Sequence, residues 1–260
     1  MELGLKGKVA LVTGSSRGIG RGIALAFAGA GCDLLLTGRD QAALGDVATS
    51  VRGKRRKAVV RALDLRDPGA PNTLVEAAQS EFGGLDILVN NAGTTRRGDF
   101  FALTDTDWED GYGLKFFAHV RLARAAWPLL KARRGSLVAI GGTSGRKPEK
   151  QFTIGSSVNA AVAAFTKCLA DLGKDDHVQV NCIHPSLVET ERQWKRIRAE
   201  VERTGEPADK IRERFCRAIG LMRYGTVEDV ADLVTFIVSS RATWLHGATI
   251  DLDGGEIPVL

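Results

Sequence analysis

The sequence has few of the features that mark secreted, metal-binding or membrane proteins. Its 260 residues include only four cysteines, Cys32, Cys168, Cys182 and Cys216, which lie far apart. They form neither a CxxC pair nor a metal-ligand pattern, so we expect reduced thiols, no metal site and a cytoplasmic location. Residues 1–14 lack the long apolar region of a signal peptide. No apolar run approaches the roughly 18 residues that span a bilayer, and we expect no membrane contact.

Aromatic residues are also scarce, at 6% of the chain, and no segment interleaves them with basic residues. The net charge of +5 and pI of about 9.1 raise the question of nucleic-acid binding. However, 36 basic residues are mixed with 31 acidic ones along the whole chain, so we expect no nucleic-acid partner. The 44% hydrophobic and 26% charged residues are typical of globular proteins, and this length can bury a large core.

Short apolar runs alternate with longer helical segments along the chain. Strands are expected at 8–13, 33–37, 58–63, 85–90, 136–140, 178–183 and 248–252. Helices are expected at 18–29, 41–52, 72–82, 107–131, 156–172 and 226–239, with a polar helical segment at 191–221. This alternation predicts an α/β fold with a doubly wound parallel sheet and helices on both faces. No repeat or linker divides the chain, so we interpret residues 1–260 as a single domain.

A glycine-rich turn follows the first expected strand and precedes the first expected helix. It is typical of dinucleotide binding, since glycines permit a tight turn and let a pyrophosphate approach the backbone. The N-terminus of the following helix then offers free N–H groups and the positive end of its dipole. The residues that we expect to contact the cofactor here are Gly14, Ser16, Arg17, Gly18, Ile19 and Gly20.

The segment Thr13–Gly20 resembles the TGxxxGIG signature of the short-chain dehydrogenase/reductase family. Further motifs follow in the order of that family: Asp64-Leu65, the NNAG sequence at 90–93, Pro185 with Thr190, and Asp253-Gly254-Gly255. The resemblance covers nearly the whole chain, from Leu5 to Gly255. It implies a Rossmann-type sheet of about seven strands, a nicotinamide cofactor, a small-molecule substrate, and a homo-oligomer, either dimer or tetramer.

The same resemblance implies roles for individual residues. Asp64, beside Leu65, would contact the adenine ring, and Asn90 would hold the sheet near the cofactor. Asn91 continues the motif, and Ala92 and Gly93 would line the adenosine side. Thr190 would hold the nicotinamide carboxamide, and Pro185 would precede it in the same loop. Ser186 stands where the family usually has glycine.

The preference for NADP or NAD depends on the residues after the second expected strand. An acidic residue there would bind the ribose hydroxyls and repel a 2′-phosphate. We align this position with Gly38, and the next residue is Arg39. The guanidinium of Arg39 can pair with a 2′-phosphate, and Arg17 lies near the same group. These residues favour NADP, although Arg39 could also stack on adenine, so NAD stays possible.

The sequence departs from the usual catalytic residues of the family. Members use a Tyr as proton donor, a Lys one helical turn later, a Ser that orients the substrate oxygen, and an Asn on the preceding long helix. Our alignment places Gly155 at the Tyr, Asn159 at the Lys, Gly142 at the Ser and Lys115 at the Asn. The Lys and the Asn are therefore exchanged between two helices that lie side by side in the family.

This exchange favours a rearranged active site over simple loss of function. A buried Lys115 beside a cofactor could have a lowered pKa and act as an acid or base. Thr143 or Ser144 could replace the lost Ser hydroxyl, and Asn159 completes the expected catalytic set. His119 and Tyr112 are one helical turn from Lys115 and are weaker candidates.

The segment that follows Thr190 would close over the substrate as a helical lid at about 190–223. Between Glu191 and Arg223 it holds ten basic and six acidic residues, a net charge of +4. Such a lid could attract an anionic substrate, although solvated charges on an amphipathic helix pair are the simpler interpretation.

Three functions fit these observations. The first is an NAD(P)(H)-dependent oxidoreductase that acts on a carbonyl or alcohol with rearranged acid–base groups. The second is a catalytically inactive dinucleotide-binding sensor or partner subunit, which the missing Tyr favours. The third, a lyase, epimerase or dehydratase on the same fold, is disfavoured because such relatives commonly keep the Tyr. We expect the oxidoreductase.

Overall fold

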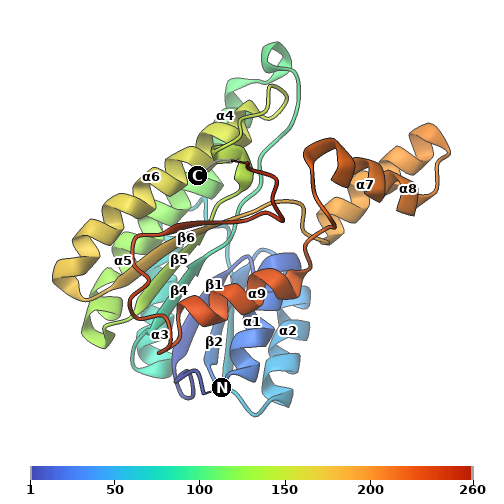
Figure 1. Ribbon diagram of the computed structural model, residues 1–260. Helices are drawn as coiled ribbons and strands as arrows, with labels where there is room; N and C mark the ends of the chain where they lie inside the picture. The colour runs from blue at the N-terminus through green and yellow to red at the C-terminus, as the bar shows by residue number, and fades with distance from the viewer. Residues whose placement is uncertain (1, 259–260) are drawn as a thin grey trace.

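The computed structural model describes residues 2–258 and is built around a parallel sheet (Figure 1). The sheet has seven strands in the order β3-β2-β1-β4-β5-β6-β7, and every neighbouring pair is parallel. The strands are β1 Val9–Thr13, β2 Asp33–Gly38, β3 Ala58–Ala62, β4 Ile87–Asn90, β5 Ser136–Ile140, β6 Gln179–Pro185 and β7 Thr249–Leu252. The predicted doubly wound Rossmann-type sheet is confirmed.

The strand order reverses direction beside β1, which pairs with β2 on one edge and with β4 on the other. In open α/β sheets the crevice outside the carboxyl ends of the strands, at such a switch point, is where ligands bind. The central strands β1, β4 and β5 are buried along their whole length, as continuous apolar runs predict for a sheet covered on both faces.

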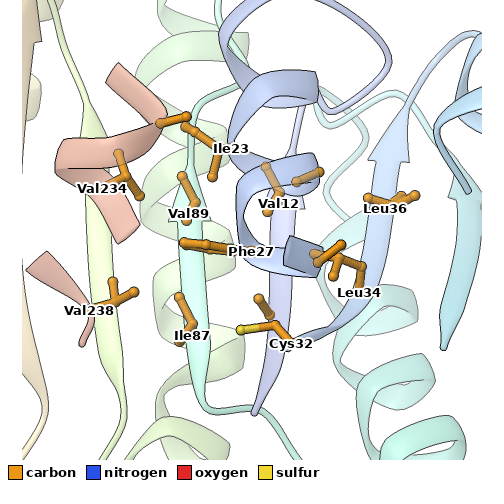
Figure 2. Packing of buried hydrophobic residues seen from close by; sticks show 14 of the residues in the cluster. Val12, Ile23, Phe27, Cys32, Leu34, Leu36, Ile87, Val89, Val234 and Val238 are labelled. Atoms are coloured by element: carbon orange, nitrogen blue, oxygen red, sulfur yellow. The ribbon is translucent and has the colours of Figure 1, made fainter. Parts of the chain in front are cut away.

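Three helices cover one face of the sheet: α1 Gly18–Gly29, α2 Gln41–Gly53 and α9 Val227–Ile237. Figure 2 shows Ile23 and Phe27 of α1 facing Val89 and Ile87 of β4, with Val234 of α9 beside them. Phe27 is fully buried, and burial of one such side chain stabilises the fold by about 1.5–3 kcal/mol. This packing fixes the start of α1 relative to the end of β1.

The opposite face is covered by α3 Ala70–Phe82, α5 Ala118–Arg133 and α6 Thr153–Asp176. Leu74 of α3 and Leu122 and Leu130 of α5 pack on Leu11 and Leu88 of the sheet in a second core. The ends of α3 and the C-terminal end of α5 lie within two residues of the sequence prediction, and α6 extends the prediction at both ends. The apolar periodicity of the sequence therefore predicted the helices on both faces of the sheet.

The predicted long helix at 107–131 is wrong in one respect, because the structure interrupts it. Helix α4, Asp105–Tyr112, begins at a capping box made by Thr104 and Asp107. A π-helical segment at Gly113–Phe117, η2, then leads into α5. Such π segments occur often at functional sites and rotate the side chains that follow them. Here the segment carries Lys115.

The polar segment at 191–221 is two helices rather than one. Helices α7, Glu191–Thr204, and α8, Ala208–Ile219, are separated by a turn at Gly205, whose φ of 72° suits a residue without a side chain. They pack on one another through a small core that includes Ile197, Ile211 and Tyr224. Figure 1 shows the pair projecting from the sheet after β6. No helix within residues 2–258 is long and apolar enough to cross a membrane.

Candidate active site

A cleft of about 970 Å³ lies at the carboxyl ends of the strands. It extends from the glycine-rich turn after β1, past the ends of β2, β4 and β5, to the first turns of α7. The predicted cofactor-binding and catalytic sets line it, whereas Asn90 and the weaker candidates His119 and Tyr112 do not. The nucleotide side holds Gly14, Ser16, Arg17, Gly18, Ile19, Gly20, Arg39, Asp64, Leu65, Asn91, Ala92, Gly93, Pro185 and Thr190, and the catalytic set holds Lys115, Thr143, Ser144 and Asn159.

The glycine-rich turn is folded so tightly that side chains would not fit. A Cβ at Gly20 would lie 2.2 Å from the carbonyl oxygen of Gly14, and Gly14 and Gly18 have φ values of 64° and 53°. The cap of α1 is Arg17, which makes no side-chain cap hydrogen bond. The first N–H groups of α1 therefore face the cleft and suit a phosphate group.

The NNAG segment braces the sheet beneath this turn, but through Asn91 and not through Asn90 as the resemblance implied. The Nδ2 of Asn91 donates to the carbonyl oxygen of Thr13 at 2.7 Å, and the hydroxyl of Thr13 accepts from the N–H groups of Asn91 and Ala92. Asn90 instead donates from Nδ2 to the carbonyl oxygen of His119, at 3.3 Å. The buried side chain of Asn90 thus connects β4 to α5.

Two guanidinium groups lie at the end of the cleft beyond β2. Arg17 and Arg39 are both exposed, and neither guanidinium makes a hydrogen bond or ion pair with any residue from 2 to 258. Asp64, in contrast, accepts hydrogen bonds from the backbone N–H and the side chain of Arg66, both at 3.0 Å. This end of the cleft therefore presents two cations without a protein counter-charge, which suits a phosphate.

The loop after β6 closes the other end of the cleft. The methyl group of Thr190 lies 3.3 Å from the position of a Cβ on Gly18, so α7 begins directly against the glycine-rich turn. The hydroxyl of Ser186 hydrogen-bonds to the carboxylate of Glu256, which also lies 3.8 Å from Lys147 Nζ. Glu256 is a cleft residue that the sequence analysis missed, because its partner Ser186 is 70 positions away.

Lys115 points from η2 toward the end of β5. Its Nζ donates a hydrogen bond to the carbonyl oxygen of Gly141 at 3.1 Å, and its aliphatic chain covers Gly93. Burial, and then the positive charge of Arg192, lower the pKa of Lys115 to about 8. A lysine with this pKa can give or take a proton near neutral pH.

His119 and Tyr112 do not join Lys115 in the cleft, so the weaker candidates of the sequence analysis are not part of this site. His119 is buried, with Nε2 3.2 Å from the carbonyl oxygen of Ala92, and burial lowers its pKa to about 3. Tyr112 stacks on Trp108. The π-helical segment separates these residues because it alters the angle between successive turns.

Asn159 of α6 connects to the short 3-10 segment Thr143–Gly145, η3, that follows β5. Its Nδ2 donates to the hydroxyl of Ser144 at 2.9 Å. A Cβ at Gly142 would lie 2.8 Å from the same Nδ2, so the amide occupies the space beside that glycine. The Oδ1 of Asn159 is buried and has no hydrogen-bond partner within residues 2–258. Thr143 is buried next to it.

The start of α6 holds an aromatic ring in an unexpected position. A Cβ at Gly155 would lie 2.1 Å from the ring of Phe152, so this ring fills the space above the glycine. The guanidinium of Arg97 lies 4.0 Å from the centre of the ring and makes a two-point ion pair with Glu149, at 2.7 and 2.8 Å. The sequence analysis missed all three, since Arg97 and Glu149 are 52 positions apart.

These features define an α/β fold with a glycine-rich turn and a cleft at the carboxyl ends of its parallel strands, the arrangement of dinucleotide-binding proteins. The family comparison gives a narrower class. The model of the family described as short chain dehydrogenase matches residues 8–201. The chain belongs to this family, as the sequence motifs predicted, and it is therefore an NAD(P)-dependent oxidoreductase of the short-chain type.

Individual relatives match nearly the whole chain. The 3-oxoacyl-(acyl-carrier-protein) reductase FabG of Aquifex aeolicus is 32% identical over 257 residues, covering 98% of this chain and 99% of the relative. The crystal structure of L-sorbose reductase from Gluconobacter frateurii, complexed with NADPH and L-sorbose, is 33% identical, with a TM-score of 0.97 and full coverage of both chains. A short chain dehydrogenase from Burkholderia cenocepacia in complex with NADP has 30% identity, a TM-score of 0.85 and coverage of 97% and 98%.

Proposed function

We propose that the protein is an NADP(H)-preferring oxidoreductase that reduces a carbonyl or oxidises an alcohol with a rearranged set of acid–base groups. The observation that carries the proposal is the position of Lys115. Its ammonium group lies in the same cleft as the glycine-rich turn, is held by Gly141, and has a pKa lowered to about 8.

The cleft fits a nicotinamide dinucleotide. The turn at Gly14 and Gly20 has no room for a Cβ, so the backbone is open to a close approach by the pyrophosphate. The start of α1 offers N–H groups for the same pyrophosphate. Arg39 and Arg17 supply cations for a 2′-phosphate, which supports NADP over NAD. NADPH would supply the hydride for reduction. The solved neighbours that contain NADPH or NADP support the same cofactor.

Lys115 takes the role of proton donor in this proposal. When a carbonyl carbon gains a hydride, its oxygen gains negative charge and must be protonated. The buried ammonium of Lys115 would stabilise that charge and then transfer its proton, and in alcohol oxidation the neutral amine would accept the proton. General acid–base groups contribute about 10²–10⁴-fold to such steps.

Asn159, Thr143 and Ser144 would orient the substrate oxygen. The Asn159 amide fixes the hydroxyl of Ser144, and its unpartnered Oδ1 is an acceptor that a substrate hydroxyl can satisfy. In the same interpretation Gly142, Gly155 and Asn159 stand at the family's Ser, Tyr and Lys, and Phe152 fills the space that Gly155 leaves.

A second candidate is a dinucleotide-binding sensor or partner subunit without turnover. The ring of Phe152 favours it, since an aromatic ring without a hydroxyl covers Gly155 and offers no proton. The two candidates differ in one property: both bind the dinucleotide, but only the oxidoreductase transfers hydride.

The test has two stages. Energy transfer from the four tryptophans would measure binding of NADPH and of NADH, and a panel of ketones and aldehydes would then be screened for NADPH oxidation. We expect tighter binding of NADPH and at least one reduced substrate. Binding without turnover across the panel would favour the sensor. No binding of either nucleotide to the folded protein would overturn both candidates.

We also propose a homo-oligomer, dimer or tetramer, located in the cytoplasm. Phe101 and Trp244 are 91% and 99% exposed, which is unusual for large apolar side chains on a monomer. Equilibrium sedimentation should give a multiple of the 27.9 kDa chain mass, and a monomer mass would contradict the proposal.

A further inference from the structure

One face of α7 carries a row of three positively charged side chains. Arg192, Lys195 and Arg196 line the cleft and are spaced as i, i+3 and i+4, so they form one stripe on the helix. None of the three makes an ion pair with any residue between 2 and 258. We call these three residues the cleft-facing stripe.

The other arginines of the lid are paired. Arg198 pairs with Glu191, Arg203 and Arg214 with Glu200, Arg212 with Glu189 and Asp209, Arg217 with Glu213, and Arg223 with Asp229. Three of the lid's excess positive charges therefore lie on the stripe, which lines the cleft and is also exposed to solvent. This arrangement favours attraction of an anion into the cleft.

The acidic residues of the cleft have their direct partners outside the stripe, although the charge of Arg196 also acts on Glu149. Glu149 is paired with Arg97, Glu191 with Arg198, and Glu256 with Ser186 and Lys147. A bound dinucleotide would bring its phosphates to the glycine-rich turn, which α7 meets at Thr190, whereas the side chain of Arg192 reaches the loop after β4.

Arg192 is the member of the stripe whose charge acts on Lys115. Its Nη2 donates to the carbonyl oxygen of Thr95 at 3.3 Å, which ties α7 to the loop after β4. The positive charge of Arg192 is also one of the causes that lower the pKa of Lys115, so the two cations act on the same space. An anion placed between them would be attracted by both.

We propose that the cleft-facing stripe is a substrate subsite for an anionic group, and that Arg192 holds a carboxylate or phosphate of the substrate while Lys115 faces its carbonyl oxygen. This inference rests on the proposed function, since it names the substrate class of that site. A guanidinium can bind either oxyanion through two parallel hydrogen bonds, so it would fix the orientation of the substrate as well as its charge.

The test compares charged substrates with uncharged analogues. The probes are pyruvate and methyl pyruvate, levulinate and methyl levulinate, and dihydroxyacetone phosphate and dihydroxyacetone, with L-sorbose as a further uncharged ketose. The first two pairs test a carboxylate and the third a phosphate. Initial rates of NADPH oxidation are measured for the wild type, Arg192→Gln and the control Arg203→Gln, whose side chain is paired with Glu200 outside the cleft.

We expect kcat/KM to favour the charged member of at least one pair by about ten-fold, the effect of one charge-assisted contact. Arg192→Gln should remove that preference through KM, lower kcat/KM for the uncharged member by less than about three-fold, and leave the Kd of NADPH unchanged. Arg203→Gln should behave as the wild type. A preference for uncharged probes in every pair would overturn the inference. So would a rise in the Kd of NADPH equal to the loss of activity, because the stripe would then hold the cofactor.

A binding measurement can test the anion subsite even if the proposed reaction does not occur. If no probe is reduced, thermal unfolding of the NADPH complex is followed with each charged probe present. Stabilisation of the wild type but not of Arg192→Gln would support the anion subsite while contradicting the proposed reaction. Absence of any stabilisation by pyruvate, levulinate and dihydroxyacetone phosphate would overturn the subsite as well.

Discussion

The ammonium group of Lys115 donates a hydrogen bond to the carbonyl oxygen of Gly141, 3.1 Å away, and so joins the π-helical segment η2 to the end of β5. This contact holds an amino group inside the cleft, at the end of the central strands. The side chain covers Gly93, where a Cβ would lie 2.9 Å from Lys115 Cδ. The position of Lys115 is therefore fixed by Gly141 at its amino group and by Gly93 along its aliphatic chain.

Replacement of Lys115 should separate catalysis from folding. Lys115→Met keeps the length of the aliphatic chain over Gly93 but removes the proton donor, so we expect kcat to fall by at least about 100-fold. The Kd of NADPH and the melting temperature should change little. Lys131→Met is the control, since Lys131 pairs with Asp176 at the far end of α5. Wild-type rates for Lys115→Met would contradict a role in proton transfer.

The pH dependence should report the same group. Lys115 has its pKa lowered to about 8, and carbonyl reduction needs its protonated form. The kcat for reduction should therefore be constant below about pH 8 and fall above it, whereas alcohol oxidation should show the opposite trend. Arg192→Gln removes a nearby positive charge, so the midpoint should move to higher pH. A rate that does not change between pH 6 and 9.5 would argue against Lys115.

Arg39 should distinguish the two nicotinamide cofactors. Arg39→Ala removes a guanidinium that no described residue neutralises, and a charge-assisted contact with phosphate is worth about 1.5–3 kcal/mol. The Kd of NADPH should rise at least ten-fold while that of NADH changes less than three-fold, as measured by fluorescence titration. Arg124→Ala, on the exposed face of α5, is the matched control. Equal losses for both nucleotides would mean that Arg39 only stacks on adenine.

Two glycines should respond to alanine in opposite directions. Gly20→Ala places a Cβ 2.2 Å from a backbone oxygen of Gly14, so we expect a loss of about 1–3 kcal/mol in the free energy of unfolding and loss of dinucleotide binding. Gly45 lies inside α2 with open space around its Cβ position. Gly45→Ala should stabilise the protein by up to about 1 kcal/mol. Urea unfolding and NADPH titration of both variants would check these signs, and equal stabilities would contradict the crowding at Gly20.

The fold could be predicted well from the sequence because its determinants are local. The apolar runs that became β1, β4 and β5 are buried on both faces, so they lack the alternation of a half-exposed strand. The alanine-rich segment after Gly18 keeps one apolar face, and this face is the one that packs on the sheet. Helix ends were less certain: Pro71 starts α3 earlier than the apolar pattern indicated.

The site could be predicted only in part. The glycine-rich turn was visible because its function depends on consecutive residues. Lys115 was found through its position in a family motif, but its partner Gly141 was not, since 26 residues separate them. The part played by Asn91 was assigned to Asn90, because only the direction of each side chain at the end of β4 distinguishes the two neighbours.

The sequence by itself determined the parallel sheet, the dinucleotide turn and the family, because each depends on a short pattern of residue types. Only the tertiary structure decided which of the arginines form ion pairs with acidic residues. It paired most arginines of α7 and α8 with acidic neighbours and left Arg192, in the same cleft as Lys115, without an ion pair among the described residues. The tertiary structure also placed the ring of Phe152 against Gly155. These outcomes depend on distances between residues far apart in the chain, and no local pattern encodes such distances.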